Sequence, residues 1–413
     1  MKKRVVITGI GAITPIGIGV RQYWEACLRG DCGTDDITLF DASNYQTKIA
    51  AEVKNFNPND FILPEIYRKI DRFAQMGVAA AKMAIEDAGV EGQYDKQNNH
   101  IPVIVGSGLG GSLFHEEQIF QLVENKEPRK VLSSSVPRIT PNAVTAYIAI
   151  QNKFRGPNIT ISTACSSGGN AIAFAASHIE NEYTDMVITG GVECPITPFT
   201  YAAYQSLRVL SKGLLGKKCS PRPFDKNRDG FVLGEAAGIL VLEELERAQK
   251  RGAKIYAELV GYASNCGAYH MAAPDPSGED AAMVMKQALM HRGVKANDVD
   301  FVSAHGTATQ ANDACEAKAI NLVMGGTRKP YVSSTKSQIG HTIGAAGAIG
   351  AIAAILSTRD NVIPPNINCD DPDEKCDINI AREAIKTRVQ YSMSNSFGFG
   401  SNNAALLFGK FLK

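Results

Sequence analysis

The fold assignment starts from "NITISTACSSGGNAIAFAASH", residues 158–178. Its first part, "NITIST", alternates β-branched and polar residues, which predicts a strand. Its last part is rich in alanine and repeats its apolar residues at intervals of three and four, which predicts a helix. Cys165 stands where the strand gives way to the helix, so the sequence places a thiol at a helix N-terminus.

Apolar segments with strand character occur along the chain in two series of five. The first series is 4–10, 101–108, 158–163, 186–191 and 238–245, and the second is 257–264, 299–306, 330–337, 390–398 and 404–411. Strand and helix signals alternate, and strands this apolar are typical of sheets covered on both faces, which indicates an α/β fold. In each series the third strand leads into a Gly- and Ala-rich helix, after Cys165 and after Lys336. We therefore expect two similar α/β halves, 1–250 and 251–413, joined near 247–254.

The composition is that of an ordinary globular protein. The 413 residues are 44% hydrophobic and 21% charged, with a net charge of +1, and they are enough to bury a large core. This charge gives no electrostatic reason to expect nucleic acid or an anionic membrane as the main partner. The nine cysteines show neither C-x-x-C nor zinc-finger spacing. We expect a cytoplasmic protein, no metal, and cysteines that are mostly small buried side chains.

Some segments resemble targeting or nucleotide-binding signals. Residues 1–19 are apolar enough for a signal peptide, but glycine and proline interrupt them and no A-x-A site follows, which favours a strand and a turn. Residues 342–358 carry no charge but fall short of the roughly 20 residues that span a bilayer, so we predict a buried helix. The glycine clusters at 9–14 and 106–111 lack the spacing of a dinucleotide site, so we interpret them as close backbone approaches and expect no cofactor.

The residues at the predicted strand ends point to acyl chemistry. Ligands gather at the carboxyl ends of parallel strands, where Cys165, His305 and Lys336 stand, and His341 follows Lys336 by five residues. Unpaired N–H groups at a helix N-terminus are expected to lower the pKa of the Cys165 thiol and make it a nucleophile. Neutral imidazoles can donate to an oxyanion or enolate. A Cys–His–Asn protease is the competing interpretation, but it explains neither two histidines with a lysine nor the duplicated halves.

Four motifs resemble those of the β-ketoacyl-acyl-carrier-protein synthases, specifically the type II enzymes. They are "TACSSG" (163–168), "AHGTATQAND" (304–313), "SSTKSQIGHTIGAAG" (333–347) and "NSFGFGSNNAALLF" (395–408), and the resemblance covers essentially the whole chain. It implies a thiolase-like fold, with two pseudo-duplicated halves in αβαβα layers, and usually a homodimer. The implied reaction condenses an acyl group on Cys165 with malonyl-acyl carrier protein, giving 3-oxoacyl-acyl carrier protein, CO₂ and free carrier protein, in fatty-acid elongation.

The resemblance also implies roles for individual residues. Cys165 resembles the acyl-accepting nucleophile, His305 and His341 the pair that promotes malonyl decarboxylation, and Lys336 the residue that supports that site. The backbone N–H groups of Cys165 and Phe399 would form an oxyanion hole, and Phe399 is similar to a gate side chain that moves when the cysteine is acylated. The other positions are expected to bind substrate (Leu109, which limits the acyl pocket, with Phe397, Thr307 and Thr309) or to dock the acidic carrier protein (Arg68, Lys69 and Arg208).

The sequence departs from the usual type II pattern at three places, which keeps other functions open. Ser166 and Ser167 follow the cysteine, as in polyketide ketosynthases, Ser401 stands where glycine is usual, and Gly350 stands where many members have glutamate. The last change removes a buried carboxylate, so we expect any ion or hydrogen-bond network associated with it to be absent or rebuilt. The alternatives are a specialised type II polyketide or polyene ketosynthase and a non-catalytic chain-length-factor subunit in a heterodimer. A thiolase is disfavoured, because no cysteine follows Cys376.

Overall fold

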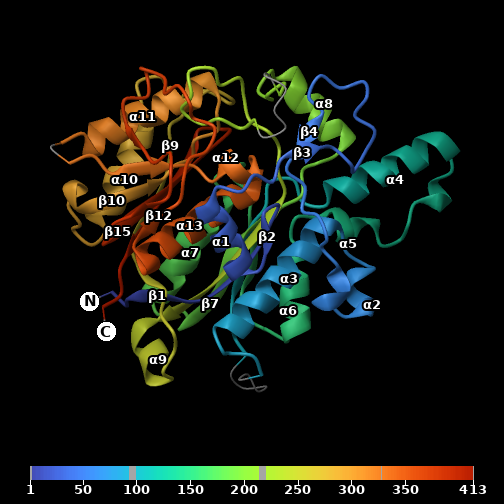
Figure 1. Ribbon diagram of the computed structural model, residues 1–413. Coiled ribbons are helices and arrows are strands. Elements are labelled where there is room, and N and C mark those ends of the chain that lie inside the picture. The colour runs from blue at the N-terminus through green and yellow to red at the C-terminus, as the bar shows by residue number, and fades with distance from the viewer. Residues whose placement is uncertain (1, 93–98, 214–219, 327, 413) are drawn as a thin grey trace.

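The computed structural model describes residues 2–92, 99–213, 220–326 and 328–412 (Figure 1). One mixed sheet runs through the molecule in the order β13-β11-β10-β15-β16-β9-β1-β8-β7-β5-β6, with β2 paired beside β1. Its strands are β1 (Val5–Thr14), β2 (Gly17–Ile18), β5 (Val103–Gly106), β6 (Asn158–Ile161), β7 (Met186–Glu193), β8 (Ala236–Glu244), β9 (Ala257–Cys266), β10 (Val299–Ser303), β11 (Tyr331–Ser333), β13 (Asn379–Ile380), β15 (Tyr391–Gly398) and β16 (Asn402–Gly409). Two small sheets pair β3 (Asp35–Asp36) with β4 (Ile49–Ala50) and β12 (Val362–Ile363) with β14 (Ile385–Lys386). All ten predicted strands are confirmed.

The two halves of the sheet repeat one strand order, which confirms the internal duplication. The first half reads β6-β5-β7-β8-β1 and the second reads β11-β10-β15-β16-β9, so each places its third, second, fourth, fifth and first strand side by side. The directions also match, because the first two pairs in each half are parallel and the last two are antiparallel. The halves join where β1 pairs with β9. The sheet is continuous there, so a domain boundary at 250/251 stays a prediction.

Helices form three layers around the two half-sheets (Figure 1). The middle layer contains α7 (Ser167–Glu180) and α13 (Ala346–Asp360), which pack on each other, on β7 and β5 on one side and on β15 and β10 on the other. Helices α3 (Arg72–Asp87) and α6 (Ala143–Asn152) cover the outer face of the first half, and α10 (Glu279–Met290) with α11 (Gln310–Met324) covers that of the second. This is the αβαβα arrangement that the resemblance implies.

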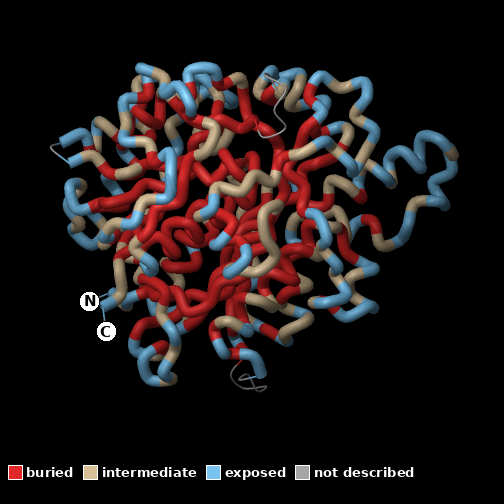
Figure 2. The backbone as a smooth tube through the Cα atoms, viewed as in Figure 1, coloured by how far each residue is buried: buried red, intermediate tan, exposed pale blue. Residues whose placement is uncertain are grey.

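The remaining helices are short or peripheral. They are α1 (Val20–Arg29), α2 (Pro64–Tyr67), α4 (Ser112–Asn125), α5 (Ser135–Ile139), α8 (Pro198–Ser206), α9 (Leu245–Lys250) and α12 (Lys336–Ile339), with 3-10 turns η1 (Pro58–Asp60), η2 (Pro128–Lys130), η3 (Ala296–Asp298) and η4 (Ile343–Ala345). Helix α9 occupies the predicted junction between the halves. Helix α4 projects from the body, and Figure 2 shows it mostly exposed while the middle layer is buried.

The apolar segments that resemble targeting signals are core elements. Among the described residues, one helical stretch, Ile343–Asp360, is long and apolar enough to cross a membrane, but 89% of it is buried inside the protein. The buried helix predicted over 342–358 is therefore confirmed. The strand predicted at the N-terminus is β1, and its glycines allow α3 to approach, since a Cβ at Gly9 or Gly11 would lie about 2 Å from the carbonyl oxygen of Ala84 or Ala80.

Candidate active site

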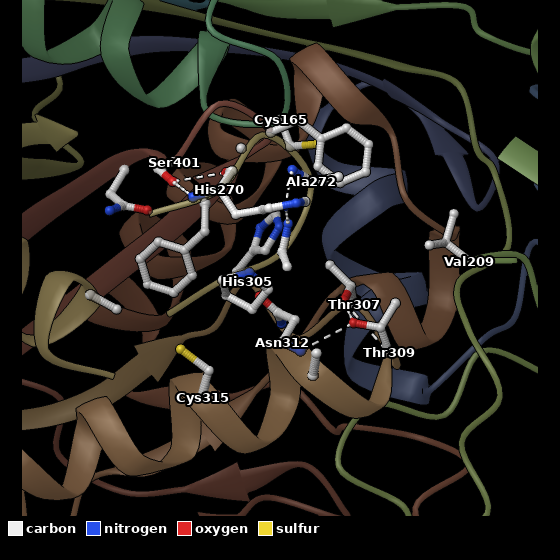
Figure 3. Close-up of a pocket in the computed structure, with 18 of the residues that line it drawn as sticks. Cys165, Val209, His270, Ala272, His305, Thr307, Thr309, Asn312, Cys315 and Ser401 are labelled. Carbon is white, nitrogen blue, oxygen red and sulfur yellow. Dashed lines mark hydrogen bonds between the residues drawn. The ribbon is translucent and has the colours of Figure 1, made fainter. Parts of the chain in front are cut away.

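Strand ends from both halves surround one cavity of about 200 Å³ (Figure 3). Cys165 lies between β6 and α7, His305 follows β10, and His341 follows α12, so residues far apart in the sequence meet here. The cavity is lined by seven of the predicted site residues, Cys165, His305, His341, Phe397, Phe399, Thr307 and Thr309. Lys336, the first residue of α12, is buried behind them and donates from Nζ to the carbonyl oxygen of His305.

A tight turn holds Cys165 at the start of α7. Ala164 has a left-handed backbone, with φ 51°, which bends the chain sharply from β6 into the helix. The Oγ of Ser166 donates to the carbonyl of Thr163 (2.8 Å), and that of Ser167 donates to the carbonyl of Ala164 (2.6 Å) and accepts from the N–H of Thr163 (2.9 Å). The two serines that depart from the usual pattern therefore brace the turn that carries the thiol.

The thiol of Cys165 is neutral at rest, so the expectation of a lowered pKa is wrong. Burial raises the pKa of Cys165 to about 12. The positive charge of Lys336 and hydrogen bonds from the backbone N–H groups of Phe399 and Cys165 act in the opposite direction, but the cost of desolvating a thiolate exceeds their effect. The proton of Cys165 must therefore leave during acyl transfer, and the two N–H groups that face the sulfur can stabilise an oxyanion there.

His341 enters the cavity because a glycine interrupts the helix predicted after Lys336. Gly340 (φ 66°) ends α12, and α13 begins only at Ala346. The Nδ1 of His341 accepts from the N–H of Ile343 at 3.3 Å, so in the neutral ring the proton sits on Nε2. Burial, and then the charge of Lys336, lowers the pKa of His341 well below its usual value, which keeps the ring neutral at pH 7.

His305 forms the second neutral imidazole. Its ring centroid lies 5.4 Å from that of His341, and the two rings cross at 84°. Burial, followed by the charge of Lys336, also lowers the pKa of His305 well below its usual value, and its buried Nδ1 has no hydrogen-bond partner among the described residues. The rings of Phe397 and Phe231 flank this pair at 5.7 and 5.0 Å, so two uncharged N–H donors face an apolar space.

Two buried carboxylates that the sequence analysis did not single out hold the loops of the site. Glu316, on α11, accepts from the backbone N–H groups of His305 (2.8 Å) and Gly306 (2.7 Å). Glu193, at the end of β7, accepts from the N–H groups of Gly108 (2.6 Å) and Gly344 (3.1 Å). Burial raises the pKa of both carboxyl groups. Two signals in the sequence could have identified them. Glu316 follows Asp313 by three residues and so shares its helix face, and Glu193 is a lone acid at the end of an apolar strand.

One wall of the cavity was also missing from the sequence analysis. The segment after β9 supplies His270, Met271, Ala272, Ala273 and Pro274, and other parts of the chain add Tyr204, Phe231 and Ile343. No local pattern marks the segment 270–274 as part of a site, because its role depends on how β9 is placed beside β16.

Besides Lys336, four predicted residues lie outside the cavity lining. Leu109 is 39% exposed in the turn between β5 and α4. Arg68 and Lys69 are exposed after α2, where the Arg68 guanidinium lies 5.8 Å from the ring of Tyr67. Arg208 is exposed after α8 and lines a separate surface pocket. The roles of these residues stay predictions.

Two serine hydroxyls lie against the place where a side chain at position 350 would begin. A Cβ at Gly350 would be 2.9 Å from the Oγ of Ser394 and 3.4 Å from that of Ser303. A glutamate would therefore need this part of the core to shift. In the part of the chain that the structure describes, no group of three or more His, Cys, Asp or Glu side chains could hold a metal ion.

Comparison with known proteins gives matches over the whole chain. Residues 2–248 match the family described as β-ketoacyl synthase, N-terminal domain, and residues 256–370 match its C-terminal domain. The 3-oxoacyl-[acyl-carrier-protein] synthase 2 of Vibrio harveyi is 42% identical over 412 residues, which are 99% of each chain.

Two solved structures extend this similarity. The ishigamide ketosynthase/chain length factor is 34% identical with a TM-score of 0.91, and each chain is fully covered. A type II polyketide acyl-carrier protein in complex with its ketosynthase, bound to the hexaketide, is 27% identical with a TM-score of 0.92 and the same coverage.

Proposed function

The chain belongs to the β-ketoacyl synthase family, and from this premise we propose how its cavity divides the reaction among its residues. The protein is a condensing enzyme, a 3-oxoacyl-acyl-carrier-protein synthase of fatty-acid elongation. It joins an acyl group to the two-carbon unit of malonyl-acyl carrier protein and releases CO₂ and free carrier protein. The observation that supports the division is the meeting of a buried thiol with two neutral imidazoles and a buried lysine.

The first half-reaction transfers the acyl group to Cys165. The sulfur bonds to the carbonyl carbon of the acyl thioester, the bond to the carrier thiol breaks, and the thiol proton leaves with the carrier. The tetrahedral intermediate places a negative charge on oxygen. The N–H groups of Cys165 and Phe399, which face the sulfur, stabilise that charge.

The second half-reaction makes the carbon nucleophile. The malonyl group loses its carboxylate as CO₂, and the electron pair of the broken C–C bond forms an enolate. The Nε2–H of His341 and the imidazole of His305 donate to the enolate oxygen, and Lys336 holds His305 through its carbonyl. The enolate carbon then attacks the acyl thioester, and Cys165 leaves as the thiol after regaining a proton.

Product analysis tests this function. The full chain is mixed with an acyl-acyl carrier protein and malonyl-acyl carrier protein, and carrier-bound products are identified by mass spectrometry. We expect a 3-oxoacyl group two carbons longer than the starting acyl group, with one CO₂ released for each. Acyl exchange without CO₂ release would refute the proposal.

A second candidate is a specialised type II polyketide or polyene ketosynthase. The paired serines after Cys165 and the similarity to the ishigamide ketosynthase/chain length factor favour it. The same product analysis separates the two, since a polyketide enzyme would accept 3-oxoacyl or conjugated starters better than saturated ones. The third alternative, a non-catalytic chain-length-factor subunit, has less support. Such subunits usually lack the nucleophilic cysteine, whereas this chain has Cys165 facing two N–H donors.

The assembly we propose is a homodimer, with a heterodimer containing a chain-length-factor-like subunit as its alternative. Helix α4 exposes Ile119, Phe120 and Val123 at 47%, 54% and 65%, and within the described residues edge strand β6 pairs on one side only. Apolar surface of this kind usually marks an interface, and a second copy would cover it. Leu109, just before α4, would then lie at the closed end of an acyl channel. A solution mass of one chain would oppose this assembly.

Carrier-protein docking is proposed for the exposed cations Arg68, Lys69 and Arg208. Changing all three to Glu should raise KM for acyl-acyl carrier protein at least tenfold, because an acidic carrier loses its electrostatic attraction. Acylation of Cys165 by a small thioester without the carrier should be unchanged. Stopped-flow or quench measurements with both donors check this. Equal losses with both donors would instead indicate damage to the fold, and no loss with either would remove these residues from the docking surface.

The proposed location is the cytoplasm. Seven described cysteines are free thiols, and six of them are buried. Cys32 is disulfide-bonded and is the described cysteine that does not fit a reducing compartment. Cell fractionation with an antibody to the full chain tests the location, and recovery in a membrane or secreted fraction would oppose it.

A further inference from the structure

Ser401 has a strained backbone and a side-chain hydroxyl that makes three hydrogen bonds. Its φ of 58° lies in the left-handed region, where glycine fits without strain. The Oγ accepts from the N–H groups of Tyr269 and His270, both at 3.3 Å, and donates to the carbonyl oxygen of His270 at 3.1 Å. A glycine would adopt this backbone conformation with less strain. The serine found here instead uses its hydroxyl to join the turn after β15 to the segment after β9.

Backbone hydrogen bonds and a histidine complete this connection. The N–H of Gly400 donates to the carbonyl of Met271 at 2.6 Å, and the N–H of Gly267 donates to the carbonyl of Ser401 at 2.9 Å. The Nδ1 of His270 accepts from the N–H groups of Ala272 (3.0 Å) and Ala273 (3.1 Å), which folds the segment back on itself. Figure 3 shows Ser401 and His270 side by side at the edge of the cavity near Cys165.

Both connected segments line the cavity. His270, Met271, Ala272 and Ala273 form one wall, and Phe399 with Ser401 forms the wall beside it. Two residues before Ser401, the N–H of Phe399 faces the sulfur of Cys165. Anything that fixes Ser401 against the segment 269–273 therefore also fixes an oxyanion donor and the width of the cavity.

We infer that the Ser401 hydroxyl is a positioning group, which fastens the segment 269–273 to the turn 398–401 and so holds the Phe399 N–H against Cys165. The inference rests on the proposed function, since acyl transfer is the step that uses this donor. Decarboxylation uses His305 and His341, which lie on other elements. Loss of the hydroxyl should therefore slow one half-reaction and spare the other.

The test compares Ser401→Ala, which loses the hydroxyl and keeps the strain, with Ser401→Gly, which loses both. Thr184→Ala is the matched control, because its hydroxyl also bonds an N–H and a carbonyl, those of Met186, at the far end of β7. Acylation of Cys165 by acyl-acyl carrier protein should fall about tenfold in Ser401→Ala and about threefold in Ser401→Gly, as expected for the loss of one to two net hydrogen bonds. Malonyl decarboxylation, measured in a Cys165→Gln background, should change less than twofold, and the control should match its parent in both assays.

Hydrogen exchange supplies a readout that needs no substrate. Peptides covering 267–273 and 397–402 should exchange several-fold faster in Ser401→Ala than in the parent, while peptides of β7 should not change. Unchanged exchange, or equal slowing of acylation and decarboxylation, would overturn the inference. If the parent protein is not acylated at all, the proposed function fails, and the exchange comparison still decides the role of Ser401.

Discussion

Replacing Cys165 by alanine should abolish condensation, while replacing it by glutamine should keep or raise the release of CO₂ from malonyl-acyl carrier protein. The alanine variant has no sulfur to carry the acyl group, so the first half-reaction cannot occur. The second half-reaction depends on His305 and His341, which the substitution leaves in place. A glutamine amide at position 165 can accept from the two N–H groups and imitate the acylated cysteine.

Both rates are measured on the same protein preparations. Condensation is followed as 3-oxoacyl-acyl carrier protein, and decarboxylation as the conversion of malonyl- to acetyl-acyl carrier protein. Cys27→Ala serves as the control, because Cys27 is also buried but lies on α1 and bonds Gln338. Full condensation by Cys165→Ala would show that another group carries the acyl chain.

The second large effect is expected from His341→Ala. Removing one preorganised donor from a developing oxyanion typically lowers kcat by about 10²–10³. We therefore expect decarboxylation to fall by about two to three orders of magnitude. Acylation of Cys165 should fall much less, because its oxyanion donors are backbone N–H groups.

The imidazole of His178 gives the matched control. It is half-buried on α7, packed between the rings of Phe174 and Tyr183 and outside the cavity lining. His178→Ala should leave both half-reactions unchanged. If His341→Ala slows acylation as strongly as decarboxylation, the division of labour proposed for the cavity is incorrect.

The fold follows closely from local patterns in the sequence. The period-two strands, the Ala-rich helix after Cys165 and the repeated order of signals correctly predict the ten strands and the duplication. The pairing of β1 with β9 could not be foreseen, because the residue pattern of a strand does not encode which strand will pair with it.

The sequence predicts some parts of the candidate site and not others. The motifs identify Cys165, His305, His341 and Lys336, but the pKa of the thiol depends on burial, which a helix-terminus argument does not include. The cavity wall at 270–274 and the support from Glu316 arise from tertiary contacts between distant segments. Ser401 was visible in the sequence as an unusual residue, yet its partners became apparent only from the three-dimensional arrangement.

The most direct measurement identifies the residue that carries the acyl group. The full chain is incubated with acyl-acyl carrier protein alone, its intact mass is recorded, and the modified residue is located by peptide mapping. We predict one acyl group per chain, on Cys165, and its loss with formation of a 3-oxoacyl product when malonyl-acyl carrier protein is added. An acyl group on Cys315, the other thiol that lines the cavity, or product formation without any acylated protein, would contradict the account.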